Sequence, residues 1–143
     1  MSMTNITLHL RIVGGMLIVL ALAHPLFGIH CDWKKDAAKL SPLNRQIFHV
    51  HTFFICLVLV LMGILCLFYP HALLSPAPAT LLGKLVLSGL TIFWGTRLLF
   101  QWFIYDWALW KGNRLNTTVH FVFTIIWIYF TLIFALALRQ QFA

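Results

Sequence analysis

Four long apolar stretches constrain the fold of this chain more than any other feature. Each has at least the roughly 20 residues that a helix needs to cross about 30 Å of hydrocarbon. Only 9% of the 143 residues are charged, whereas a soluble domain has about a quarter. Backbone polar groups in lipid must bond internally, which helices do, and the alternation expected of barrel strands is absent.

We therefore predict an all-α polytopic membrane protein, an antiparallel bundle of four transmembrane helices. The predicted helices cover residues 8–29, 42–69, 80–104 and 115–138 of a single transmembrane domain, residues 1–143. The first helix has some features of a signal peptide, with Arg11 before the apolar run and small residues at Ala21 and Ala23. Its start is only weakly basic, so we expect a true membrane span.

Lysines and arginines are concentrated in two of the three predicted connections. These connections lie on one side of a four-helix protein and contain Lys34, Lys35, Lys39 and Arg45, then Lys111 and Arg114. The other side has Arg11, Lys84 and Arg139. The positive-inside rule predicts that the first and third connections are cytoplasmic and that both termini are external. Topology and attraction to anionic lipid account for these charges, so we expect the lipid bilayer, and no nucleic acid, as a partner.

Most polar side chains capable of chemistry fall in one layer near the predicted cytoplasmic ends of the helices. Helical rise places the histidines of this layer roughly 5–9 Å inside the membrane boundary. Ionisable residues inside a span usually face the protein interior and have a function. The candidate cofactor-binding residues are His24, Arg45, His49, His51, Arg97, Gln101, Tyr105 and His120. The alternative for each is anchoring at the membrane interface, where histidine, tyrosine and snorkelling arginine are common.

Helical spacing indicates that this layer faces a bundle core. Stripes of small or polar residues follow each helix: Gly14, Leu17, Ala21, His24 and Gly28; Arg45, His49, Thr52, Cys56 and Gly63; Trp94, Arg97, Gln101 and Tyr105; and Thr117, His120, Thr124, Thr131 and Ala135. Small and hydroxyl residues mark helix–helix contacts in membranes. We therefore predict four stripes that meet around a polar pocket.

Acidic residues are almost absent. The chain has three, Asp32, Asp36 and Asp106, and all fall in predicted connections. A carboxylate proton relay, a di-iron site and aspartate-bound magnesium are therefore not expected. Arg97 then has Asp106, backbone carbonyls or an anionic ligand as expected partners. The three cysteines form no C-x-x-C motif, so neither a zinc knuckle nor a thiol redox pair is indicated.

Two segments resemble each other. The segment "NRQIFHVHTFF" (residues 44–54) aligns without a gap to "NRLNTTVHFVF" (residues 113–123), which matches His51 with His120. A duplicated helix pair and chance in a biased composition both explain this similarity. The repeat selects His51 as the inward histidine of the second helix, whereas the polar stripe selects His49. The two positions are about 200° apart around a helix, so they cannot point the same way.

The segments "SPLNRQIFHVHTFF" and "FWGTRLLFQWFIYDWALWKG" resemble parts of small four-helix bacterial membrane proteins of uncharacterised function. The resemblance covers most of the chain. It implies a multi-pass protein of the bacterial inner membrane and carries no activity with it. No Walker loop, H-E-x-x-H, catalytic triad or Rossmann fingerprint is present, so the sequence leaves open whether the protein is an enzyme.

Three functions fit these residues. The first is binding of a redox cofactor, haem b or a quinone; His49 and His120 are then the expected haem ligands, and Arg45 and Arg97 neutralise the propionates. A quinone uses the same groups as hydrogen-bond partners. The second is an enzyme or carrier for an anionic lipid or isoprenoid phosphate. The third is an accessory subunit whose aromatic faces bind other membrane subunits.

Overall fold

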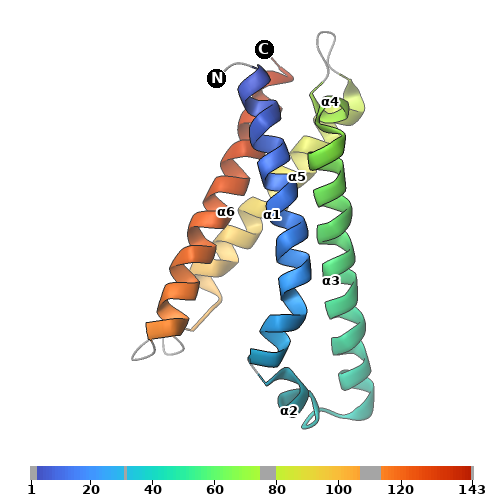
Figure 1. Cartoon of the computed structure of the whole chain (residues 1–143), viewed down its shortest axis with the longest axis vertical. Helices are drawn as coiled ribbons and strands as arrows, with labels where there is room; N and C mark the ends of the chain where they lie inside the picture. The colour runs from blue at the N-terminus through green and yellow to red at the C-terminus, as the bar shows by residue number, and fades with distance from the viewer. Residues whose placement is uncertain (1–2, 31, 75–79, 107–113, 143) are drawn as a thin grey trace. The chain divides into compact units, whose positions relative to one another are not determined.

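The computed structural model describes residues 3–30, 32–74, 80–106 and 114–142, which are helical apart from short connections (Figure 1). The helices are α1 (Met3–His30), α2 (Trp33–Ala37), α3 (Pro42–Phe68), α4 (Pro70–Leu73), α5 (Leu81–Phe103) and α6 (Arg114–Gln140). Four of them, α1, α3, α5 and α6, are long and apolar enough to cross a membrane. The predicted all-α fold with four membrane-spanning helices is confirmed.

The helix bounds differ from the predicted ones mainly at the start of the chain. Helix α1 begins at Met3 rather than near Leu8. Within its first turns, the Thr7 hydroxyl donates to the Met3 carbonyl at 3.0 Å. Three parts of the predicted connections lie outside the described residues: Cys31, residues 75–79 and residues 107–113, which include Lys111.

The described chain forms two compact units. The α1–α3 unit is Arg11–Pro70, and the α5–α6 unit is Met1–Leu10 with His71–Ala143. Helix α1 therefore contributes its first turns to one unit and the rest to the other. The single transmembrane domain expected for residues 1–143 stays a prediction.

Two glycines bring α1 and α3 of the α1–α3 unit into close contact. A Cβ atom on Gly14 would lie 2.5 Å from the backbone nitrogen of Leu67 and 2.7 Å from the carbonyl oxygen of Gly63. A Cβ atom on Gly63 would lie 2.6 Å from Cγ1 of Ile18. Backbones this close tolerate no side chain, which is the usual role of small residues between membrane helices. The prediction that these two stripes mark a helix contact is confirmed at Gly14 and Gly63.

The start of α3 follows from its sequence. Pro42 occupies the first turn, where its missing N–H costs nothing, and the Ser41 hydroxyl accepts from the Asn44 N–H at 3.4 Å. Helix α3 therefore begins at residue 42, as predicted. Asp32, which precedes α2, has a left-handed backbone conformation with φ 52°, and this turns the chain from α1 into α2.

Helices α5 and α6 pack side by side and antiparallel in the α5–α6 unit (Figure 1). The indole rings of Trp94 and Trp127 stack with centroids 5.0 Å apart, and Phe130 meets Trp94 edge-on at 4.8 Å. Trp94 and Phe130 are buried. The position of a Gly95 Cβ would be 3.8 Å from the Thr131 methyl group. Thr131, a member of the predicted stripe on the fourth helix, therefore lies at the contact with α5.

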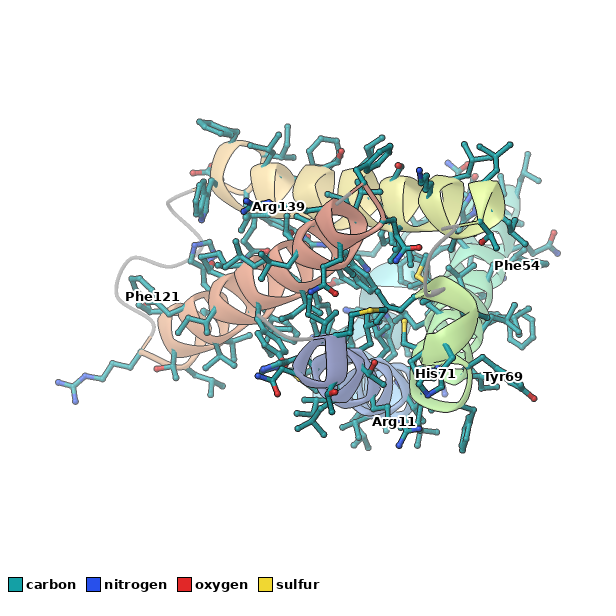
Figure 2. All side chains as sticks on the ribbon, turned by 90° about the horizontal axis from the view of Figure 1, so that it is seen from above. Arg11, Phe54, Tyr69, His71, Phe121 and Arg139 are labelled. Atoms are coloured by element: carbon teal, nitrogen blue, oxygen red, sulfur yellow. The ribbon has the colours of Figure 1, made fainter. Side chains whose placement is uncertain are left out.

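Large apolar side chains cover the outside of the long helices. Phe54 and Tyr69 point away from α3, and Phe121 points away from α6 (Figure 2). Each of these side chains is more than half exposed. Helices with such surfaces are compatible with contact to bilayer hydrocarbon.

Candidate functional site

The predicted polar layer divides between the two units. Arg97, Gln101, Tyr105 and His120 belong to the α5–α6 unit, whereas His24, Arg45, His49 and His51 belong to the α1–α3 unit. One shared pocket for all eight residues stays a prediction.

A chain of hydrogen bonds joins three residues of the α5–α6 unit. The guanidinium NH1 of Arg97 donates to Oε1 of Gln101 at 3.1 Å, and Nε2 of Gln101 lies 2.8 Å from Nδ1 of His120. Arg97 and Gln101 share one face of α5 because they are four residues apart. Gln101 is buried, and its side chain crosses from α5 to α6. The sequence placed these residues at one depth, and the structure brings them into contact.

This chain fixes the tautomer of His120. Arg97 only donates, so the Gln101 atom that faces it must be the carbonyl oxygen, and the amide NH2 must then face His120. An NH2 group donates, so Nδ1 of His120 accepts and carries no proton. The neutral ring therefore holds its proton on Nε2. Any group that bonds to Nε2 of His120 in this arrangement has to be an acceptor.

Arg97 is surrounded by neutral groups. Besides Gln101, its NH2 donates to the Tyr105 hydroxyl at 3.5 Å, and its guanidinium carbon lies 5.1 Å from the ring centroid of Trp127 and 5.6 Å from that of Tyr105. Aromatic faces attract cations, so these rings stabilise a charge in the span. Within the described chain, two of the five guanidinium N–H donors are in hydrogen bonds. The sequence predicted other partners for Arg97 and missed this amide, phenol and aromatic set.

Tryptophans complete the cluster. Trp127 stacks on Phe123 with centroids 5.4 Å apart and on Trp94 with centroids 5.0 Å apart. The indole N–H groups of Trp94 and Trp127 are buried and have no hydrogen-bond partner among the described residues. Sequence reasoning did not select Trp127, although a signal was present. It lies seven residues after His120, two turns along the same face of α6.

A second polar contact lies away from this cluster in the same unit. Nδ1 of His9 is 2.9 Å from the Tyr129 hydroxyl, and the two rings meet edge-on. Ile6 and Leu10, on either side of His9, are buried. This pair joins the first turns of α1 to α6. The sequence analysis missed it, because its members are 120 positions apart and no spacing within one helix connects them.

The histidines of the α1–α3 unit contact aromatic rings or their own helix. The His24 ring meets Trp33 edge-on at 6.0 Å, and the His49 ring meets Phe48 at 5.5 Å. Nδ1 of His51 lies 2.9 Å from the Ile47 carbonyl oxygen, so Nδ1 carries the proton and donates.

Both His49 and His51 are exposed, as is Arg45. The conflict between the polar stripe, which selects His49, and the repeat, which selects His51, therefore stays open. His51 does have the tautomer that metal ligation through Nε2 needs.

Side chains that commonly bind metal ions do not cluster in the described residues. No group of three or more His, Cys, Asp or Glu side chains gathers within the ranges that the structure describes. Axial ligation of haem by two histidines needs no such group, so the predicted ligands His49 and His120 remain a prediction. They belong to different units. The three carboxylates lie outside the membrane-spanning helices, as predicted.

Comparisons with protein-family models, with curated proteins and with solved structures find no match to this chain.

Proposed function

We propose that this protein binds an isoprenoid quinone at the Arg97–Gln101–His120 cluster and takes part in membrane electron transfer. The observation that carries the proposal is the Gln101 amide between Arg97 and His120. It orients His120 as a donor through Nε2 and leaves Arg97 with further N–H donors. Quinone carbonyl oxygens are acceptors, and a membrane-soluble quinone reaches a site within a helix pair from the bilayer.

A quinone fits this cluster better than a haem. Iron ligation needs an unprotonated ring nitrogen directed at the metal, whereas the Gln101 hydrogen bond to Nδ1 favours the His120 tautomer that carries its proton on Nε2. The Phe123 ring, which is partly exposed and stacks on Trp127, provides a flat surface on which a quinone ring can stack. The charge of Arg97 favours the reduced, more negative forms of a bound quinone. Haem b stays the alternative redox cofactor, with His51 as the histidine whose tautomer suits it.

A second candidate is binding of an anionic lipid or isoprenoid phosphate, as an enzyme or a carrier. The observation in its favour is that the partners of Arg97 are neutral. Charge at this depth costs roughly 2.5–3.5 kcal/mol on insertion scales, and an anion offsets it. The two candidates differ in what Arg97 must supply. A phosphate needs its charge, whereas a quinone needs donors that His120 also provides.

We further propose that the protein lies in a bacterial inner membrane with both termini external. The basis is the excess of lysine and arginine between α1 and α3 and after α5. The quinone site then lies near the cytoplasmic leaflet, and another membrane subunit supplies or receives the electrons. Reporter fusions test the topology: a periplasm-dependent phosphatase should be active at either terminus, and activity of a cytoplasm-dependent reporter there would contradict it.

The quinone proposal is tested on protein purified in mild detergent. Solvent extraction followed by chromatography should recover quinone bound to the wild type, and the absorption spectrum should have no Soret band. His120→Phe should lose most of the quinone, and Arg97→Gln should weaken binding about tenfold, the loss of one charge-assisted hydrogen bond. The matched control is Arg139→Gln, which removes an exposed arginine at the far end of α6.

The outcomes separate the candidates. A Soret band that disappears in His51→Ala would replace quinone with haem. Co-purified phosphate-bearing lipid that vanishes in Arg97→Gln but persists in His120→Phe would replace it with the anionic ligand. Quinone content that is equal in the wild type and in both variants would reject the site.

A further inference from the structure

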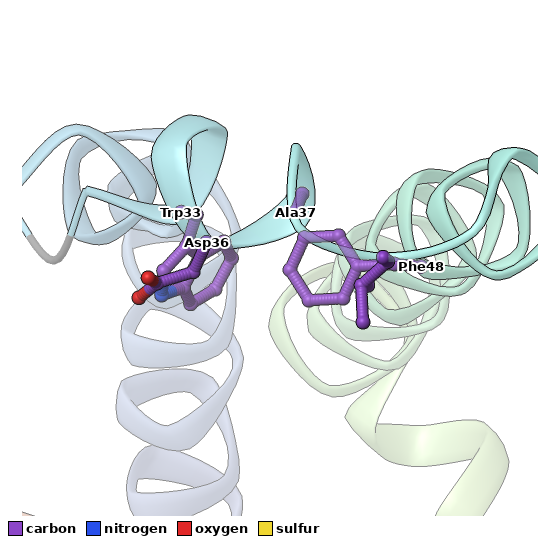
Figure 3. A pocket seen from close by; sticks show the side chains of 5 residues that line it. Trp33, Asp36, Ala37 and Phe48 are labelled. Atoms are coloured by element: carbon purple, nitrogen blue, oxygen red, sulfur yellow. The ribbon is translucent and has the colours of Figure 1, made fainter.

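The α1–α3 unit contains a small apolar hollow beneath α2. Trp33, Asp36, Ala37, Leu40 and Phe48 line its volume of about 190 Å³. Figure 3 shows Trp33 and Asp36 on one side of it and Phe48 on the other. Sites for complete drug-sized ligands measure roughly 300–1,000 Å³. This hollow therefore holds only part of a molecule.

One face of α2 and the residues just after it forms most of the hollow. The lining residues Trp33, Asp36, Ala37 and Leu40 follow the helical spacing of three and four, so they share a face. Trp33 is held by the edge of Phe48 at 5.5 Å, and a Cβ on Gly28 would lie 3.1 Å from its ring. A short amphipathic helix between two membrane spans is typical of a segment that lies in the headgroup layer.

Exposed basic side chains lie close in sequence to the residues that line the hollow. Lys34 and Lys35 are exposed on α2, and Arg45 is exposed on α3, one turn before Phe48. The one carboxylate in the lining, Asp36, is paired with Lys39 at 2.7 Å, and this hydrogen bond lowers the pKa of Asp36. The pair cancels its own charge, so the remaining cations set the local potential.

We propose that an anionic phospholipid binds here, with its phosphate at Arg45 and the α2 lysines and one acyl chain in the hollow. A phospholipid has an anionic headgroup, which the exposed cations attract, and long acyl chains. The small apolar hollow holds part of one acyl chain, and the rest of the lipid stays in the bilayer. This site is separate from the quinone cluster and rests on different residues. It gives the α1–α3 unit a specific lipid partner rather than a general attraction to membranes.

Native mass spectrometry of the full chain with equal amounts of phosphatidylglycerol and phosphatidylethanolamine tests the proposal. Wild-type protein should retain the anionic lipid preferentially. Lys35→Gln combined with Arg45→Gln should reduce its affinity about fivefold per side chain. The control combines Lys84→Gln and Arg139→Gln, which remove the same charge elsewhere and should leave binding unchanged.

A second pair of measurements isolates the hollow. Leu40→Trp, at a half-exposed position that tolerates a larger ring, should fill it and weaken phospholipid binding with all cations present. Soluble glycerol phosphate should not compete, because it has no acyl chain. Equal loss of lipid in the control variant, full binding in Leu40→Trp, or competition by glycerol phosphate would each overturn the proposal. A dimer peak that Leu40→Trp removes would assign the hollow to a second copy instead.

Discussion

Replacement of Gln101 with methionine should uncouple Arg97 from His120 with little change in side-chain volume. Gln101 is 4% exposed, so water cannot replace its hydrogen bonds readily. Two bonds are lost: one from a guanidinium at 3.1 Å and one to an imidazole at 2.8 Å. Interhelical hydrogen bonds in membranes contribute about 0.6 kcal/mol on average and at most about 1.7 kcal/mol, so we expect a total loss of about 1–3 kcal/mol.

The assay is reversible unfolding in mixed micelles of mild detergent and dodecyl sulfate. Gln101→Met, His120→Phe and the double variant form a thermodynamic cycle that isolates the bond between the two side chains. The expected coupling free energy is about 0.6–1.7 kcal/mol. The control cycle pairs Gln101→Met with Thr131→Val, because the Thr131 hydroxyl bonds its own helix at Trp127. That cycle should be additive.

One result of this cycle would refute the proposed bond between Gln101 and His120. If the two substitutions add within about 0.3–0.5 kcal/mol, the usual limit for independent sites, Gln101 does not hold His120. His120 would then have no fixed tautomer and would not be a donor through Nε2. Destabilisation by His120→Phe alone would not rescue the argument, since packing changes also contribute to it.

The remaining predictions concern both units. Gly14→Ala should destabilise the α1–α3 unit by about 1–3 kcal/mol through overpacking against Leu67, whereas Gly15→Ala, with nothing within 4 Å of its Cβ, should be neutral or stabilising; equal melting temperatures for the two variants would contradict this. The Asp36–Lys39 pair lowers the Asp36 pKa, so its small contribution to folding is present above pH about 4 and is lost as the pH falls further; NMR titration of the Asp36 carboxyl group should give a midpoint below that of Asp36 in Lys39→Gln. In haem titrations, His51→Ala should weaken any binding more than His49→Ala, and the reverse order would favour the polar stripe over the repeat.

The number and kind of the long helices could be predicted from the sequence, because length and hydropathy decide which segments can cross a bilayer. The sequence was also sufficient for some helix faces. The places of Gly14 and Gly63 in stripes that mark helix contacts, and the shared face of Arg97 and Gln101, both follow from residue spacing along single helices. The predicted start of the second membrane helix at residue 42 likewise agrees with α3, which begins at Pro42 behind the Ser41 cap.

The contacts between helices were harder to predict. Hydropathy gives the depth of a residue but not its rotation toward a particular neighbour. The sequence therefore predicted that Gln101 and His120 lie at the same depth, but it did not predict the hydrogen bond between them. It did not predict the His9–Tyr129 pair at all. The Trp127 ring beside Arg97 was missed because spacing along one helix does not show which residue of a neighbouring helix faces it. The protonated nitrogen of His120 depends on three side chains together, so no single motif encodes it.

Photolabelling with an azido-quinone tests the central claim most directly. The protein is irradiated with the labelled quinone in lipid nanodiscs, with and without excess unlabelled quinone, and the modified peptides are mapped by mass spectrometry. The account predicts label on α5 and α6 near Arg97, His120 and Trp127, displaced by unlabelled quinone and lost in His120→Phe. Label spread over the lipid-facing surfaces at Phe54 and Phe121, unaffected by competitor, would contradict it.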